Sequence, residues 1–313
     1  MKKTLIISIV LIIALATAAI LIVPRLGESS GVKVSADTVE KSDGTVQIEE
    51  NDPASLEDAA PAVEEEPDTT PLYEATKTVL VSEDGGFKVV IDGEEITLTP
   101  DGTDVREGVE CGIYLAEDGS KYVFAPDGEF MSVMHSLEEQ MDACSLYMEG
   151  VLEAVSEDEA VAVAEETFFS LFGSKIERAE LTGAYFDETG IYSIYFNEMV
   201  GKDKNIRGLQ YYAMVLPDGK VFSAGTNLSI LLRDVRVCDL DKFTAEYIEN
   251  DFRDKINEYY GDDLISYSIE EITFKNVNKK TQLFVIADPE IKNRENYSSP
   301  WFSVYYDIPG VSD

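Results

Sequence analysis

The chain has 313 residues, of which 61 are acidic and 25 are Lys or Arg, so its formal net charge at pH 7 is −36. Residues 1–26 carry +3 and residues 27–71 carry −11, which leaves −28 on residues 72–313. A protein of that charge repels nucleic acid and anionic lipid, which excludes both as expected partners and favours basic peptides or divalent cations.

Residues 1–26 are predicted to form an N-terminal membrane anchor. Two lysines precede an apolar run from Leu5 to Val23 that contains only two polar residues. At ~1.5 Å per residue this run approaches the ~30 Å thickness of a bilayer core. A cleaved signal peptide is the alternative, because residues 16–18 have the small-x-small form of a cleavage site. The run is longer than an ordinary signal-peptide core, so we favour an uncleaved single-pass anchor in the cell membrane, with the C-terminal part outside the cytoplasm.

Residues 27–71 are predicted to form an acidic linker. They hold 13 acidic residues against two lysines, together with four prolines. The segment has too little apolar surface to offset the entropy of ordering, so a disordered, extended stalk is expected. A binding tail for a basic partner is the alternative interpretation of the same charge.

Residues 72–135 are predicted to form a small module rich in β-hairpins. Short alternating runs are separated by Asp-Gly pairs, which are strong signals for tight turns between antiparallel strands. The predicted strands are 78–81, 87–91, 95–98, 112–115 and 122–124. The predicted turns begin at Asp84, Asp92, Asp101, Asp118 and Asp127.

A first helix is predicted to begin at Ser136, which forms a capping box with Glu139, and to end near residue 148. Its apolar stripe is expected to be Leu137, Met141, Cys144 and Met148. A stripe of methionine and cysteine has the ligand type that copper(I) prefers. Core packing explains the stripe without a metal, so neither a metal site nor a cofactor is predicted.

Residues 156–172 carry a second and stronger helix signal. Ser156 and Glu159 form a capping box, and Gly173 is the expected stop. Apolar residues then recur at three- and four-residue spacing, which is typical of an amphipathic helix. The predicted inward stripe is Val161, Ala164, Phe168, Leu171 and Phe172.

After Gly173 the hydrophobic period changes to two, which indicates strands. The predicted strands are 181–186, 191–199, 211–216 and 220–228. The last two are joined by the turn Pro217-Asp218-Gly219, where Pro presets the backbone and Gly accepts a positive φ. One helix packed on about four antiparallel strands is therefore the predicted unit.

The Pro-Asp-Gly hairpin occurs twice in the sequence. Residues 125–133 match residues 216–224 in the turn, two hydrophobic residues, a serine and a closing small hydrophobic residue, at an offset of 91 positions. This offset is too long for a solenoid repeat but fits tandem small domains.

The helix opening Val155-Ser-Glu-Asp-Glu-Ala, the Tyr-x-Ile-Tyr-Phe strand and the strand that ends in Pro-Asp-Gly-Lys-Val resemble PepSY-type repeats. The resemblance covers about 156–228 well, 111–135 as a terminal hairpin only, and 240–308 weakly. It implies small α+β modules of bacterial cell-envelope proteins that act in peptidase inhibition, as propeptides or in envelope binding. The shared pattern carries no catalytic residue.

Residues 230–313 are predicted to form a second α+β module that is either a divergent repeat or an unrelated unit. A helix is expected over 239–260 and strands over 266–274, 281–287 and 301–308. The expected inward stripe of this helix is Leu240, Phe243, Tyr247, Ile248, Phe252, Ile256 and Tyr259. The predicted fold class is thus α+β, with tandem helix-on-sheet modules at 136–229 and 230–313 behind the all-β module, the linker and one transmembrane helix.

Outward-facing aromatic residues are the candidate binding residues. Along 301–308 the strand period turns Trp301 and Tyr305 away from the helix, and the same period turns Tyr195 outward in the central unit. The opposite, inward face is Phe302, Val304, Tyr306 and Ile308. Rigid aromatic side chains with a polar tip often anchor a partner. The alternative, which we favour, is that this far face packs against a neighbouring unit, because residues 211–216 and 283–287 are apolar on both faces and need cover there too.

No sequence pattern specifies a catalytic centre. Cys111, Cys144 and Cys238 lie far apart in apolar patterns, so at most one disulfide could form and buried free thiols are expected. The only histidine, His135, sits between a strand and a capped helix, where a polar residue is expected for structural reasons. We therefore predict a membrane-tethered, extracytoplasmic, non-enzymatic protein that binds or regulates a protein or peptide partner, for example as a peptidase inhibitor or an envelope-binding module. An ectodomain that regulates a membrane signalling kinase, and a hydrolase that uses acidic residues, are the alternatives.

Overall fold

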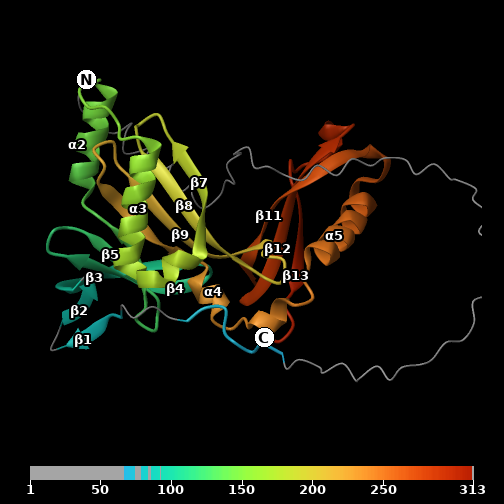
Figure 1. Cartoon of the computed structure of the whole chain (residues 1–313), viewed down its shortest axis with the longest axis horizontal. Helices are drawn as coiled ribbons and strands as arrows, with labels where there is room; N and C mark the ends of the chain where they lie inside the picture. The colour runs from blue at the N-terminus through green and yellow to red at the C-terminus, as the bar shows by residue number, and fades with distance from the viewer. Residues whose placement is uncertain (1–66, 75–78, 84–85, 92, 312–313) are drawn as a thin grey trace, which may run out of the picture. The chain divides into compact units, whose positions relative to one another are not determined.

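The computed structural model describes residues 67–74, 79–83, 86–91 and 93–311. The predicted anchor, and the predicted linker up to residue 66, lie outside the described residues. In these described ranges no helix combines the length and the apolar character that a membrane span needs. The described chain is mixed α+β, with a large and a small antiparallel sheet and few helices (Figure 1).

The larger sheet has ten strands within the described ranges, in the order β1-β2-β3-β4-β5-β6-β10-β9-β8-β7. Their bounds are β1 Val81–Glu83, β2 Gly86–Ile91, β3 Glu94–Arg106, β4 Val109–Ala116, β5 Lys121–Phe124, β6 Phe130–Met134, β7 Ala179–Phe186, β8 Tyr192–Val200, β9 Ile206–Val215 and β10 Val221–Asn227. Strands β6 and β10 hydrogen-bond to each other, with Gly225 opposite Ser132. Strands on either side of the predicted boundary at 135/136 therefore belong to one sheet.

Strand β3 corrects one predicted turn. It continues through Asp101, and its pairing with β4 shifts by one residue between Pro100 and Gly102. Gly102 has a φ of 144°, a conformation that glycine adopts easily at a bulge. The predicted turn at Asp101 is wrong, because this Asp-Gly pair forms a bulge and the chain reverses at Glu107-Gly108 instead.

Helix α3, Glu157–Phe172, packs on β8, β9 and β10 (Figure 1). The predicted capping box is confirmed: Ser156 Oγ accepts from the Glu159 amide at 3.3 Å, and Glu159 Oε2 accepts from the Ser156 amide at 2.9 Å. The buried residues of α3 are Ala160, Ala164, Phe168, Leu171 and Phe172. Val161, which was predicted to belong to this stripe, is only half-buried, and Ala160 is buried in its place.

Helix α2, Leu137–Met148, has the predicted bounds but a rotated inner face. Ala143 and Cys144 are buried, whereas Met148 is exposed. In the last turn Tyr147 points inward instead, with its ring 6.0 Å from that of Phe186. The placement of Met148 in the inner stripe is therefore wrong.

The smaller sheet has the order β11-β12-β13. Its strands are β11 Leu264–Val277, β12 Lys280–Ile291 and β13 Phe302–Asp307, so the three predicted strands are confirmed, with β11 and β12 longer than expected. Helix α5, Ala245–Tyr260, contributes to the same core, since the rings of Phe252 and Phe302 lie 5.4 Å apart. Short helices connect the two sheets: α4 Ser229–Leu232 and the 3-10 turn Val237–Leu240.

Helix α5 begins later than predicted. Residues 237–240 form a separate short turn, and Thr244 caps α5 by accepting a hydrogen bond from the Tyr247 amide at 3.1 Å. Tyr260 is only 4% exposed, whereas Tyr259 is 59% exposed and Tyr247 is also exposed, so the inward placement of Tyr247 and Tyr259 is wrong.

The segment that enters the fold, residues 67–74, lies beside residues 235–238. The amide of Leu72 donates to Val235 at 2.9 Å, and the amide of Val237 donates to Thr70 at 2.9 Å. Tyr73 is buried, and its hydroxyl donates to Glu129, which also accepts from Arg233. Burial and then the charge of Glu129 raise the pKa of Tyr73. The entering segment is therefore attached through backbone bonds and through a buried polar cluster.

Candidate functional site: a groove beside helix α3

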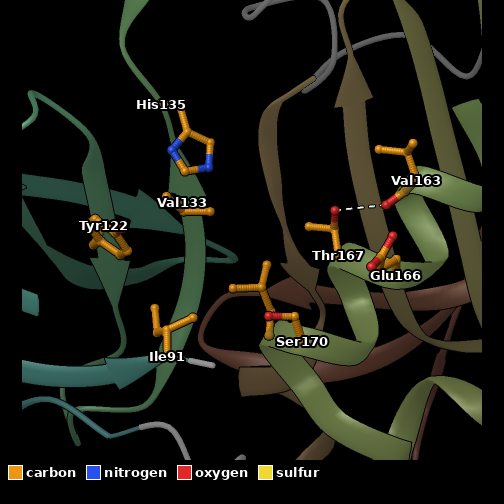
Figure 2. Close-up of a pocket in the computed structure, with 9 residues that line it drawn as sticks. Ile91, Tyr122, Val133, His135, Val163, Glu166, Thr167 and Ser170 are labelled. Carbon is orange, nitrogen blue, oxygen red and sulfur yellow. Dashed lines mark hydrogen bonds between the residues drawn. The ribbon is translucent and has the colours of Figure 1, made fainter. Parts of the chain in front are cut away.

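A cavity of about 310 Å³ opens between α3 and the strands β2, β5 and β6 (Figure 2). We call it the α3 groove. The residues that line it are Ile91, Tyr122, Val133, His135, Val163, Glu166, Thr167, Ser170 and Leu171. Figure 2 shows the sheet residues on one side and the helix residues on the other. The groove is therefore formed by residues from distant parts of the chain.

The floor of the groove is apolar. Tyr122 and Val133 are buried on adjacent strands, and Leu171 is buried on α3. Ile91 and Val163 are half-buried at its sides. Tyr122, Val133 and Leu171 belong to the main hydrophobic core, and Ile91 and Val163 pack against it. The groove is thus an open continuation of the hydrophobic core.

The helix wall of the groove lies next to the buried stripe of α3. Positions 163, 166, 167 and 170 follow each other at three- and four-residue spacing, so they form a second stripe on the same helix. The Thr167 hydroxyl donates to the Val163 carbonyl at 2.8 Å, which satisfies it within the helix. Glu166 and Ser170 are exposed at the rim. One carboxylate therefore borders an apolar floor.

His135 closes one end of the groove. Its Nδ1 lies 3.2 Å from Ser120 Oγ, and Ser120 Oγ donates to Asp118 Oδ2 at 2.9 Å. Because the single hydroxyl proton goes to Asp118, the Nδ1–H of His135 is assigned as the donor to Ser120. In a catalytic triad the histidine lies between serine and aspartate. Here the serine lies between them and is only 1% exposed, so this arrangement does not present a nucleophile.

A second cavity of about 270 Å³ adjoins the groove at His135. It is lined by Asp118, Ser120, His135, Ser136, Leu216, Lys220, Val221 and Phe222. Burial, followed by the charge of Asp118, raises the pKa of Tyr122, so this phenol is neutral at physiological pH. Polar groups thus gather at the His135 end, away from the apolar floor.

The predicted binding residues lie on two different sheets. Tyr305 on β13 is 48% exposed, and its ring lies 4.9 Å from that of Phe284 on β12. Trp301 is half-buried directly before β13. Tyr195 is half-buried on β8, with its ring 5.9 Å from that of Tyr185. Tyr305 lies in the smaller sheet and Trp301 directly precedes its last strand, whereas Tyr195 belongs to the larger sheet.

The alternation that singled out Tyr305 is present in the structure. On the opposite face of the strand, Tyr306 and Ile308 are buried, and Phe302 and Val304 are half-buried against the core.

All three cysteines are free thiols, with Cys111 and Cys144 buried and Cys238 half-buried. Over the described ranges no group of three or more His, Cys, Asp or Glu side chains is arranged to hold a metal ion.

No protein family model matches this chain, and no curated protein matches it. Among solved structures, the Bacillus megaterium YpeB C-terminal domain is similar at 11% sequence identity with a TM-score of 0.33, over 69% of this chain and 85% of that one. A score of this size does not establish a shared fold. The PepSY-type resemblance of residues 156–228 therefore remains a prediction from the sequence.

The groove residues were missed because their signal is not local. The second stripe on α3 is visible in the sequence as Val163, Thr167 and Ser170 beside the apolar stripe. Nothing in the sequence shows that Ile91 and Tyr122 lie opposite this stripe, because that depends on the pairing of β6 with β10.

Proposed function

We propose that this chain is a non-catalytic binding or regulatory protein whose α3 groove holds a segment of a protein partner. The observation that supports this proposal is the chemistry of the groove: an apolar floor, an open mouth and one carboxylate among nine lining residues. A volume of about 310 Å³ is at the small end of ligand pockets, and it fits one or two side chains of a partner. Acid–base catalysis would need two groups aimed at one reacting atom. Glu166 and His135 come from opposite walls of the groove, which supports binding over catalysis.

We also propose that residues 1–26 hold the protein in the cell membrane, with the folded part outside the cytoplasm. This rests on the apolar run from Leu5 to Val23. Tethering raises the effective concentration of the groove for partners on the same membrane. The resemblance to PepSY-type repeats makes a peptidase or an envelope component the first partner class to test.

Site-specific photocrosslinking in the full-length chain tests the groove. A photoreactive amino acid replaces Ser170 at the rim of the groove, or Phe169, which is 56% exposed and does not line it. We expect a discrete protein adduct from position 170 and a much weaker one from position 169. Equal adducts from both positions would mean that the groove is not the binding site.

A second pair of variants blocks the groove directly. Thr167→Trp places a large ring in the groove, and Ala162→Trp places the same ring at an exposed position of α3 outside it. The adduct from position 170 should disappear with Thr167→Trp and persist with Ala162→Trp, at unchanged thermal stability. A substrate turnover that is abolished by Glu166→Gln would instead favour the hydrolase alternative.

A further inference from the structure

The groove lies in the most one-sidedly charged part of the chain. From Tyr122 to Ser174 the sequence contains 12 acidic residues and neither lysine nor arginine. This stretch supplies eight of the nine residues that line the groove, all except Ile91. The helix wall, most of the floor and the His135 end are therefore built from a segment without lysine or arginine.

All five acidic residues of α3 are exposed. They are Glu157, Asp158, Glu159, Glu165 and Glu166, and the helix has no basic residue in its last turn. Two other acids of the stretch are already compensated, because Asp127 and Glu129 pair with Arg233. Five of the 12 acidic residues are thus exposed on α3, beside the groove, and five more, at positions 138, 139, 142, 149 and 153, lie on α2 or between α2 and α3.

The lysines on neighbouring strands do not cancel this charge. Lys121 precedes Tyr122, so the strand period points it to the other face of the sheet, where it pairs with Asp101 at 3.0 Å. Lys88 on β2 pairs with Glu95 at 2.9 Å. Lys220, at the adjoining cavity, lies 3.7 Å from Asp218. Each of these lysines therefore has a carboxylate partner of its own.

We propose that the occupant of the α3 groove is a basic protein segment in which a large apolar side chain is flanked by lysines or arginines. This inference rests on the proposed function and adds the chemistry of the partner. The apolar side chain enters between Tyr122, Val133 and Leu171, where it leaves water. A flanking cation meets Glu166 at the rim and fixes the orientation of the segment, and the field of the acidic surface steers the segment toward the groove.

Defined peptides test this inference on the full-length chain in nanodiscs of neutral lipid. The probe is a fluorescein-labelled peptide with four lysines, spaced by glycines, around a central phenylalanine. One matched peptide replaces the phenylalanine by glycine, and another replaces the lysines by glutamates. We expect the lysine-phenylalanine peptide to bind at least tenfold more tightly than either, by fluorescence anisotropy, and to weaken several-fold from 50 to 300 mM salt because screening acts on the charges.

Matched variants locate the binding. Glu166→Lys at the groove should weaken the lysine-phenylalanine peptide about tenfold, whereas Glu165→Lys, with the same change in net charge but outside the groove lining, should weaken it less than threefold. Thr167→Trp should abolish the preference for phenylalanine over glycine, and Ala162→Trp should retain it.

Three results would overturn the inference. Equal binding of the phenylalanine and glycine peptides would show diffuse adsorption to an acidic surface. Equal binding of the lysine and glutamate peptides would show an apolar groove that ignores charge, which leaves the proposed function intact. If no peptide binds, the basic partner is excluded, and crosslinking from position 170 still decides the proposed function by itself.

Discussion

Val133 on β6 pairs with Ala224 on β10, and these two residues hold the same position in the two copies of the Pro-Asp-Gly hairpin. The turns have matching hydrogen bonds, since Ala125 donates to Glu129 at 2.8 Å and Leu216 donates to Lys220 at 2.8 Å. The two hairpins therefore pair edge to edge through β6 and β10, and a local two-fold axis relates them. Sheet order continues this relation outward, as β5 and β9 flank the central pair.

Gly225→Ala should weaken this central junction. A Cβ at position 225 would lie 2.4 Å from Ser132 Cβ and 2.8 Å from the Met131 carbonyl oxygen, so the strands would have to separate. We expect a loss of about 1–3 kcal/mol in unfolding free energy, as for other overpacked sites, measured by urea denaturation. Gly86→Ala is the control, because its Cβ would meet no atom within 4 Å. Equal stability of the two variants would contradict the close approach of β6 and β10.

Phe168→Ala should remove the centre of the core under α3. Phe168 is fully buried, with its ring 5.7 Å from that of Phe196 and 5.8 Å from that of Tyr211. We expect a loss of about 3–5 kcal/mol through the lost burial and the cavity left behind. Phe169→Ala, at an exposed position one residue later, should change stability by less than about 0.5 kcal/mol. A loss below about 1 kcal/mol for Phe168→Ala would place its side chain elsewhere.

Glu198→Gln should stabilise the protein at neutral pH. Burial raises the pKa of Glu198, and the charges of Arg178 and Lys175 offset this only in part. A carboxyl with a raised folded pKa favours folding fully below its unfolded pKa, and this contribution is lost as pH rises through the folded value. The variant should therefore have a higher Tm than the parent at pH 7, and this difference should vanish below about pH 4. Glu180→Gln, at an exposed position on β7, is the control for the loss of one carboxylate.

The thiols should react at different rates. Burial, followed by the charge of Asp187, raises the pKa of Cys144 to about 11, so roughly one thiol in 1,000 is ionised at pH 8. Cys238 is half-buried. Under native conditions we expect iodoacetamide to label Cys238 at least tenfold faster than Cys144, as measured by peptide mass spectrometry. In denaturant the two rates should converge, and equal rates in the native protein would contradict the burial of Cys144.

Protease added to intact cells should release a soluble fragment. If residues 1–26 anchor the chain with its C-terminal part outside, cleavage should fall in the predicted linker and stop before Asp68, where backbone hydrogen bonds to residues 235–238 begin. Mass spectrometry of the released fragment gives its first residue. Protection of the chain until the cells are lysed would mean that the proposed orientation is wrong.

Local signals in the sequence predicted the elements well where a single residue fixes them. The capping box at Ser156 gave the start of α3, and the Pro-Asp-Gly turn gave the β9–β10 hairpin. Asp101-Gly102 has the same local chemistry as a turn, but strand β3 continues through these residues as a bulge in its pairing with β4. The choice between turn and bulge depends on a partner strand, so the dipeptide alone could not decide it.

The groove and the inner faces of α2 and α5 depended on long-range packing. Tyr259 and Tyr260 are adjacent residues of the same type, yet Tyr260 is buried and Tyr259 is exposed, and the sequence does not show which of the two meets the smaller sheet. The predicted site residues Trp301, Tyr305 and Tyr195 followed from strand alternation alone. That rule says which residues face away from a helix, but it cannot show where another part of the chain leaves an opening.

The attachment of residues 68–72 to residues 235–238 has a mechanical consequence. Along the chain, residues 235–238 lie between β10 of the larger sheet and helix α5, which packs on the smaller sheet. Tension applied at residue 67 would act first on the three backbone hydrogen bonds from Leu72, Val237 and Cys238, and then on Tyr73 where it bonds to Glu129. A pull on the N-terminal side would therefore load the connection between the two sheets before it loaded either hairpin.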